Sequence, residues 1–549
     1  MKHNKYSLLI LITPLLLVGC TTNEYKGEME TKIIPFNELS GGYDIDDTNI
    51  KTYFPNGSSI PYIDVSDTIS SLDGLFDSGS ISVTLNTLVN TFTVTKYYQG
   101  YPYYKMYINY ANDTIKMNDF DMINSLLKSI STTSYNSYLT LKDYQFDETS
   151  GITFSLKDYG FDILYYQKKC LMPLFIFNTI FLSPNMYNLF YNGEEYYGYY
   201  GEISTSDEYY ELIYKSNLNN MTQTVEEREY AYNSLCFVFD YYYGLKEDKK
   251  ITKTSDYISK DNQALLKSTN ANDNNIGLKQ FILHDIDELH SRVDTLSMYS
   301  EYDNTFPYYL DECGDRWKSY YSLRSTLQEY RGELSNDVRI KDDTAIITLN
   351  SFKTGSNKYL YDEDGNVLDT AYLYDSYFQM KHDLEIINNY KDVKNVIIDI
   401  SLNGGGNIGA MIRVLGYLTN NNISLHYKDL INSQNQMISY HVDISNSINT
   451  NYKYYILTSG NSFSAANFFT SIAKDMGIAT IVGQTTGGGM CSVIPLVLGD
   501  GSAITISSYN TTRNNKYGSI EYGITPDIVI PYSDFYNKES PMTSPIHFE

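Results

Sequence analysis

Two stretches of this sequence join an apolar run to a helical pattern through a glycine turn, and each could present backbone N–H groups to a reacting group. In the first, Asn403-Gly404-Gly405-Gly406 follows the apolar run 396–400 and precedes a helix expected from about Ile408. Glycine lets the backbone turn its N–H groups outward at such a junction. This turn is therefore predicted to bind an anion or an oxyanion.

The second stretch, 457–467, contains a tight turn at Gly460 and then a helix that begins with small residues. Ser464 lies at the start of this helix, where backbone donors are close and a substrate has room. Serine is also a common N-terminal helix cap, which is the structural alternative. The presence of two such glycine turns favours a nucleophile at Ser464.

A nucleophilic serine needs a general base, and histidine is the most frequent one. His290 closes a predicted helix, in the segment Asp285-Ile286-Asp287-Glu288-Leu289-His290-Ser291. A helix C-terminus favours any cationic side chain, so a purely structural role is the alternative for His290. Four other histidines remain candidates for the base: His284, His382, His426 and His441.

The elements that must position these residues alternate between strand and helix in the last third of the chain. Five apolar runs there predict buried strands: 345–349, 396–400, 454–457, 479–482 and 503–506. Buried strands with helices between them are typical of an α/β sheet. Ligands of such sheets bind beyond the carboxyl ends of the strands, and both glycine turns follow a strand.

The remainder of the chain divides by pattern. Acidic first turns and apolar periodicity predict a helical domain over 205–336, with helices over 276–289 and 317–330. Short aromatic and β-branched runs predict a Tyr-rich α+β region over 56–204. Within it, 98–104 is echoed by 191–197, which suggests a duplicated module. The other predicted segments are a tether over 20–55, a catalytic domain over 337–535 and a C-terminal tail over 536–549.

The N-terminus resembles the signal of a bacterial lipoprotein. Lys2 and Lys5 precede the apolar run 8–17, and Leu17-Val18-Gly19-Cys20 is similar to the cleavage box of that signal. The resemblance implies removal of the signal peptide 1–19 and lipidation of Cys20, for example with palmitate, so that the protein is anchored on the outer face of a bacterial cell membrane. An uncleaved helical anchor is the alternative, but the apolar run is shorter than the roughly 20 residues that a span needs.

Composition limits the partners. The 549 residues include 41 Lys and Arg against 66 Asp and Glu, for a net charge of −25 at pH 7. Binding to nucleic acid requires a basic face, so no nucleic-acid partner is expected. Four cysteines follow Cys20 without a Cys-x-x-Cys pair, at positions 170, 236, 313 and 491. This spacing predicts neither a zinc site nor a redox pair, and no disulfide is assigned. No metal and no cofactor are expected.

Four segments of the last third, in this order, resemble the motifs of the tail-specific, or C-terminal-processing, serine peptidase family. They are the strand and Asn-x-Gly-Gly turn in 396–406, the nucleophile segment Ser462-Phe463-Ser464-Ala465-Ala466-Asn467, the Gly-rich segment 479–489 and the Gly-x-x-Pro-Asp motif in 521–527. The resemblance implies a ClpP/crotonase-like fold for the catalytic domain. It also implies that Ser464 is the nucleophile.

Three features depart from that family. Gly489 stands where the processing proteases carry a catalytic lysine, which excludes a Ser-Lys dyad at its usual place. Asn467 stands where the family has glutamate. The residues between His290 and the catalytic domain are expected to be helical and leave no room for a PDZ domain, so recognition of a substrate's C-terminal tail is not implied.

The segment around His290 resembles the Asp-x-His-Ser/Thr motif of the branch that includes tricorn protease. The resemblance implies His290 as general base, Glu521 as the carboxylate that orients it, and an oxyanion hole of backbone N–H groups from Ala465 and from Gly405 or Gly406. The expected reaction is hydrolysis of a protein or peptide substrate through a seryl acyl-enzyme. Two alternatives remain: an inactive surface lipoprotein that binds peptides or another ligand in the same cleft, and a Tyr-rich adhesin that acts through residues 60–200.

Overall fold

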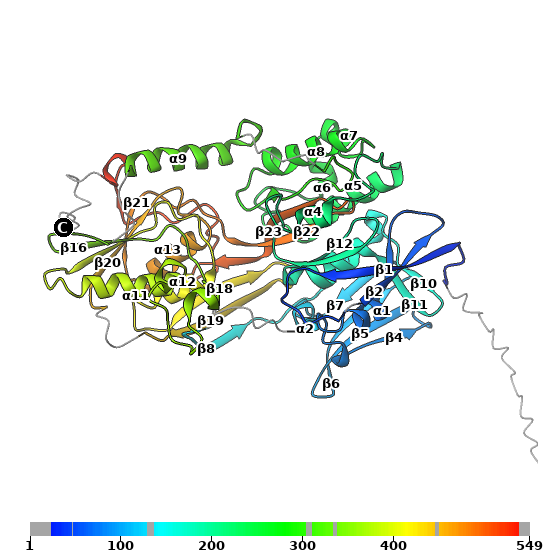
Figure 1. Ribbon diagram of the computed structural model, residues 1–549, viewed down its shortest axis with the longest axis horizontal. Coiled ribbons are helices and arrows are strands. Elements are labelled where there is room, and N and C mark those ends of the chain that lie inside the picture. Colours follow the sequence, from blue (N-terminus) through cyan, green and yellow to red (C-terminus); the bar gives the residue numbers. More distant parts are fainter. Residues whose placement is uncertain are drawn as a thin grey trace, which may run out of the picture.

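Figure 1 shows the computed structural model of the protein, which describes residues 23–46, 48–128, 137–302, 310–332, 338–444 and 450–536. We call residues 23–204 the N-terminal region and 205–332 the helical region, and we call 338–536 the catalytic segment after the catalytic domain that the sequence predicts there. The catalytic segment lies at one end of the molecule and the N-terminal sheets lie at the other. The predicted signal peptide, Cys20 and the tail beyond 536 lie outside the described residues. Within the described ranges, no helix is long and apolar enough to cross a membrane.

A six-stranded sheet forms the centre of the catalytic segment, in the order β15-β16-β17-β20-β21-β24. Its strands are β15 (Arg339–Lys341), β16 (Thr344–Thr348), β17 (Asn395–Asp399), β20 (Lys453–Thr458), β21 (Thr480–Gly483) and β24 (Ile528–Val529). From β16 onward all neighbouring strands run parallel. β17 is buried along its whole length, as expected of a parallel strand covered on both faces. The first four predicted strands are thus confirmed.

Helices cover both faces of this sheet. Helix α9 (Asp315–Arg331) lies on one face and buries Leu327 against Ile397 and Tyr455. The other face carries α11 (Ser376–Ile387), α12 (Ile408–Leu415) and α13 (Ala465–Met476), as Figure 1 shows. The helix predicted over 317–330 is therefore confirmed as α9, and it packs on the catalytic sheet although it precedes the predicted domain boundary.

A second sheet joins all three regions. Its order is β14-β23-β18-β19-β8, with β22 also paired to β23. The strands are β8 (Leu139–Phe146), β14 (Arg292–Val293), β18 (Ile423–Asp429), β19 (Gln434–Val442), β22 (Cys491–Val497) and β23 (Ala503–Arg513). The predicted strand over 503–506 lies here, in β23. Because β8 comes from the N-terminal region and β14 from the helical region, strand pairing crosses both predicted domain boundaries.

Much of the predicted tether over 20–55 is instead a pair of strands in a seven-stranded sheet. The order of this sheet is β10-β11-β3-β2-β1-β13-β12, with β1 (Met29–Glu38), β2 (Thr48–Pro55), β3 (Tyr62–Asp64), β10 (Leu164–Tyr166), β11 (Lys169–Pro173), β12 (Tyr187–Tyr191) and β13 (Tyr196–Tyr200). In β1 only Ile34 and Phe36 are buried. A strand with one short buried face gives little sustained periodicity, which is why the sequence suggested a tether.

A five-stranded sheet completes the N-terminal region, in the order β4-β5-β6-β7-β9. It contains β4 (Ile81–Asn86), β5 (Thr91–Tyr98), β6 (Tyr101–Asn109), β7 (Thr114–Met117) and β9 (Ile152–Ser155). The echoed segments 98–104 and 191–197 are the turns of the β5–β6 and β12–β13 hairpins. The two hairpins lie in different sheets, and their loops have two and four residues. The duplication therefore stays a prediction.

Besides α9, the described N-terminal and helical regions contain eight α-helices: α1 (Val65–Ser71), α2 (Met122–Leu126), α3 (Leu174–Phe177), α4 (Tyr210–Tyr214), α5 (Val225–Tyr241), α6 (Thr254–Tyr257), α7 (Lys260–Leu266) and α8 (Ala271–Lys279). Helix α5 begins with a capping box between Thr224 and Glu227. Helix α8 continues as a π-helix over Gln280–Ile286, which confirms the helix predicted over 276–289. The chain leaves it at Asp287, whose φ is 43°, and His290 follows in a turn.

Candidate active site

Ser464 lies at a sharp junction between β20 and α13. Its backbone has φ 57° and ψ −120°, a conformation that non-glycine residues rarely adopt and that persists only where the surroundings enforce it. The Ser464 N–H donates to the Gly488 carbonyl at 2.8 Å. Its hydroxyl makes no capping bond to α13. The structural alternative of a helix cap therefore does not describe what this hydroxyl does.

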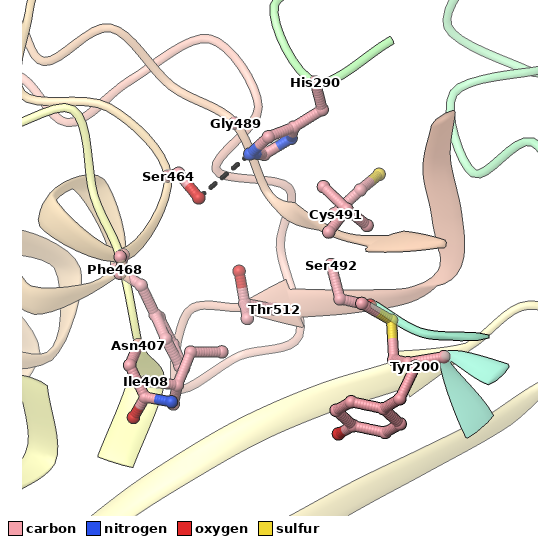
Figure 2. Close-up of a pocket in the computed structure, with 14 residues that line it drawn as sticks. Tyr200, His290, Asn407, Ile408, Ser464, Phe468, Gly489, Cys491, Ser492 and Thr512 are labelled. Atoms are coloured by element: carbon pink, nitrogen blue, oxygen red, sulfur yellow. Dashed lines mark hydrogen bonds between the residues drawn. The ribbon is translucent and has the colours of Figure 1, made fainter. Parts of the chain in front are cut away.

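His290 meets Ser464 directly. The His290 Nε2 and Ser464 Oγ atoms are 2.9 Å apart (Figure 2), although the two residues come from different regions. Burial lowers the pKa of His290 to about 4, with Arg292 and Arg316 adding to the effect and Glu288 opposing it. The imidazole is consequently neutral at neutral pH and can accept the serine proton.

Two buried carboxylates lie near His290, and they make different contacts. Glu288 Oε1 accepts the His290 backbone N–H at 2.7 Å and lies 3.7 Å from Nδ1 of the ring. Glu521 accepts the Met490 N–H at 2.9 Å and pairs with Arg316 at 2.8 Å. The structure thus brings Ser464 and His290 together as predicted, while the carboxylate within 4 Å of the His290 ring is Glu288 and the polar contacts of Glu521 are with Arg316 and Met490.

The predicted oxyanion donors, Ala465 and either Gly405 or Gly406, lie close to Ser464. A Cβ atom at Gly405 would lie 2.8 Å from the Ser464 Cβ and 3.0 Å from the Ala465 nitrogen. The glycine turn can therefore lie this close to Ser464 only because Gly405 has no side chain. The Gly405 N–H donates to the Asn403 side chain at 2.8 Å. No acceptor among the described residues takes the N–H of Ala465 or of Gly406. These two N–H groups are therefore available to an oxyanion.

A cavity of about 610 Å³ opens in front of Ser464. Its lining includes His290, Gly406 and Ala465 from the machinery described above, and Ile408 and Phe468 from α12 and α13. It also includes two residues of the N-terminal region, Met186 and Tyr200. Ser464, His290, Ala465 and Gly406 thus line one space that is large enough for part of a peptide.

Comparison with known proteins identifies the catalytic segment. Residues 343–530 match the model of a family described as peptidase family S41. The catalytic segment is a peptidase family S41 domain. The matched range contains Ser464, both glycine turns and Glu521, and S41 peptidases are serine peptidases. His290 and the rest of the residues before 343 lie outside the matched range.

Solved structures are similar to parts of the chain. A Parabacteroides merdae protein described as a candidate peptidase shares 17% identity with a TM-score of 0.40, covering 55% of this chain and 89% of that one. A lipoprotein from Streptococcus agalactiae shares 18% identity with a TM-score of 0.33, covering 55% and 92%. The photosystem II D1 C-terminal processing protease shares 17% identity with a TM-score of 0.27, covering 37% and 47%. No curated protein matches the chain.

The S41 domain has no space for a lysine at the position of Gly489. A Cβ atom there would lie 2.5 Å from the Phe463 ring. Phe463 in turn packs against the His290 ring, with 4.6 Å between centroids. Asn467, at the other departure, is buried and links Thr486 to the Ile520 carbonyl. An aromatic ring that supports the histidine therefore occupies the space where a lysine side chain would begin.

The competing histidines have partners elsewhere. His284 Nδ1 lies 3.0 Å from Asp285, the His382 ring stacks on Tyr372 at 3.9 Å, and His426 packs against Tyr517. His441 lies in β19. Among the described histidines, His290 is the one hydrogen-bonded to Ser464.

Sequence reasoning missed three contributors. Glu288 stands within the quoted Asp285–Ser291 segment, so an acid two residues before the histidine was the available signal. Asn403 belongs to the glycine turn, but its bond to Gly405 became evident only from the structure. Arg316 gave no signal, because its contact with Glu521 depends on how α9 packs on the sheet.

Proposed function

We propose that this protein is a serine-type endopeptidase that hydrolyses peptide bonds through a seryl acyl-enzyme. The observation that carries the proposal is the 2.9 Å contact between Ser464 Oγ and a neutral His290 Nε2. A serine within hydrogen-bond reach of an unprotonated imidazole has its proton acceptor in place. The S41 family match supports the same reaction class.

The reaction begins when Ser464 Oγ attacks the carbonyl carbon of the scissile bond and His290 Nε2 takes the serine proton. The negative charge that develops on the carbonyl oxygen is stabilised by the N–H groups of Ala465 and Gly406. The C–N bond then breaks as His290 gives its proton to the leaving amine. Water attacks the acyl-enzyme while His290 accepts a water proton, and return of that proton to Ser464 restores the enzyme.

We assign the carboxylate beside the imidazole to Glu288, because its Oε1 lies 3.7 Å from His290 Nδ1. Its negative charge would stabilise the imidazolium that forms during catalysis. Glu521 would act through Arg316, a half-buried side chain with which the buried Glu521 carboxylate forms an ion pair. The assignment of Glu521 as the direct partner of His290, inferred from motif resemblance, is the competing hypothesis.

A ClpP/crotonase-like fold for the S41 domain is part of the proposal. Its support is the parallel sheet β16 to β24 with helices on both faces and the antiparallel sheet beside it. The nucleophile then lies beyond the carboxyl end of β20, where α/β sheets bind their ligands.

We further propose that the protein is lipidated at Cys20 and held on the outer face of a bacterial membrane. The support is the signal-like sequence over 1–20. Metabolic labelling with a palmitate analogue tests this part, with Cys20→Ala as the matched variant. Label in the parent chain and its loss in Cys20→Ala are expected, whereas equal labelling of both would refute lipidation at Cys20.

The experiment that tests the peptidase proposal is labelling of the purified protein with a fluorophosphonate, read by mass spectrometry. Label on Ser464 is expected in the parent protein, with none on Ser464→Ala. Circular dichroism confirms that the variant is folded. A folded parent protein that takes no label would contradict the proposal and favour a binding lipoprotein that uses the same cleft.

A further inference from the structure

The S41 domain supplies only part of the lining of the cavity in front of Ser464. On one side the lining is formed by Ile408 and Phe468, and β22 and β23 contribute Ser492, Val493 and Thr512. Met186 and Tyr200 line it as well, from either side of the open end of the β12–β13 hairpin of the N-terminal region. Figure 2 shows Tyr200 across Thr512 from Ile408 and Phe468. The cleft is therefore incomplete without the N-terminal region.

The open end of this hairpin has a fixed backbone. Tyr187 pairs with Tyr200 in the antiparallel register, and the Met186 carbonyl accepts the Gly201 N–H at 2.7 Å. Met186 has φ 62°, which turns the chain from the preceding helical turn into β12. A wall of fixed geometry is what a pocket that selects side chains needs.

A buried hydrogen-bond chain joins the hairpin to β22, which also lines the cavity. Ser183 Oγ donates to Asn188 Oδ1 at 2.7 Å, which orients the amide so that Nδ2 donates to the Pro495 carbonyl at 3.1 Å. Asn188 is 2% exposed, and Pro495 belongs to the same strand, β22, as the cavity residue Val493. Since a buried amide without partners is costly, this bond holds the N-terminal wall at a set distance from β22.

Among the described residues, the lining includes no Asp, Glu, Lys or Arg. Its one histidine, His290, is neutral at neutral pH. The apolar bodies of Ile408, Phe468, Val493, Met186 and Tyr200 surround a few neutral polar groups. A charged side chain would lose its hydration here without gaining a counter-charge. Methionine and tyrosine instead fit apolar side chains of varied shape, since one is flexible and the other offers a broad ring.

We propose that the β12–β13 hairpin forms one wall of the substrate-binding cleft and that Met186 and Tyr200 select an uncharged, apolar side chain of the peptide beside the scissile bond. This inference rests on the proposed peptidase function and gives the N-terminal region a role in it. Met186 and Tyr200 are specificity-determining residues, and neither takes part in proton transfer.

The test measures binding separately from hydrolysis. In the Ser464→Ala background, fluorescence anisotropy reports the affinity for a labelled decapeptide with a central leucine and for two versions with aspartate or lysine at that position. The leucine peptide is expected to bind at least about tenfold more tightly than the charged versions, and Tyr200→Ala or Met186→Ala to lower its affinity about tenfold. Tyr200→Phe should keep most of the affinity, because the ring remains.

Tyr144→Ala is the matched control, since Tyr144 is 44% exposed against 42% for Tyr200 and is not among the residues that line the cavity. It should leave peptide affinity unchanged. Equal affinity for leucine and aspartate peptides, including no binding of either, would overturn the inference, as would unchanged leucine affinity in both Tyr200→Ala and Met186→Ala.

Labelling by diisopropyl fluorophosphate separates this inference from the peptidase proposal. Tyr144→Ala with Ser464 intact should be labelled at the parent rate, and circular dichroism should show that Tyr200→Ala is folded. Absence of labelling in the parent protein would contradict the peptidase function. The peptide affinities would then still show whether Met186 and Tyr200 select the bound side chain. Loss of labelling only in Tyr200→Ala would overturn the inference, because Tyr200 would then support the machinery rather than select the substrate.

Discussion

Ser464 and His290 touch, yet the molecule holds them by different means. Ser464 is fixed by its own backbone: its left-handed φ, its N–H bond to Gly488 and the close approach of Gly405 leave little freedom. His290 is fixed by side chains from several segments, with Glu288 on its backbone N–H, the Phe463 ring against its ring and Ser507 near Nδ1.

This difference has consequences for how the site can fail. A nucleophile held by backbone geometry tolerates changes in the side chains around it, because its position is set by the strand–turn–helix junction. A base held by side chains loses its orientation when any of them is shortened. We therefore expect substitutions of His290 and of the side chains that hold it to lower the labelling rate in graded steps while Ser464 stays correctly placed.

The largest expected effect is that of His290→Ala. Removal of a general base typically lowers the rate about 10²–10⁴-fold, and the fluorophosphonate labelling rate of Ser464 should fall by that factor. Because the backbone-held nucleophile remains in place, added imidazole should restore part of the rate by entering the space that the ring vacated. Undiminished labelling in His290→Ala would show that another group is the base.

The next largest effect separates the two carboxylates. Glu288→Gln should lower the labelling rate roughly tenfold to a hundredfold, because a negative charge about 4 Å from the imidazolium that forms contributes roughly 1–4 kcal/mol. The glutamine oxygen can still accept the His290 N–H, so the loss isolates the charge. Glu521→Gln should lower the melting temperature, since it weakens the ion pair of the buried Glu521 carboxylate with Arg316, while lowering the rate less. A larger rate loss in Glu521→Gln would establish Glu521 as the orienting carboxylate.

The same contrast explains what the sequence could predict. Ser464, Ala465 and the glycine turn lie in continuous strand–turn–helix patterns, and local patterns define their geometry. Gly406 could be separated from Gly405 only once the Asn403 side chain was seen to occupy the Gly405 N–H. Arg316 and Met186 depend on how distant elements pack, and no local pattern encodes that. The strand β1 was missed because it buries only Ile34 and Phe36, and β2 because its buried residues run consecutively over 52–54 and do not alternate clearly.

The pH dependence of the labelling rate is a third test, and it concerns the burial of His290. Burial lowers the pKa of His290 to about 4, so nearly all of the imidazole is neutral at pH 5.5, whereas an ordinary histidine with a pKa near 6.5 would be about tenfold depleted in its neutral form. The labelling rate should stay nearly level from pH 7.5 to 5.5 and fall near pH 4. An inflection near 6.5 would show that His290 is not buried as described.

This profile needs a stability control, because the same shift acts on folding. Between pH 6.5 and 4 the unfolded chain binds a proton at this histidine that the folded chain does not, so the contribution of His290 lowers the stability of the folded state as the pH falls. Circular dichroism at each pH distinguishes loss of folded protein from protonation of the base in folded protein.

The smallest expected effect is that of Ser507→Ala. Ser507 Oγ lies 3.5 Å from His290 Nδ1, at the limit of a hydrogen bond, so its removal should slow labelling only about twofold to threefold, within the weak end of such bonds. Ser439→Ala, a buried serine of β19, is the matched control and should leave the rate unchanged. If Ser507→Ala instead costs as much as Glu288→Gln, the hydroxyl and not the carboxylate selects the tautomer of His290, and the side-chain support of the base would depend on β23 rather than on the turn that follows the π-helix.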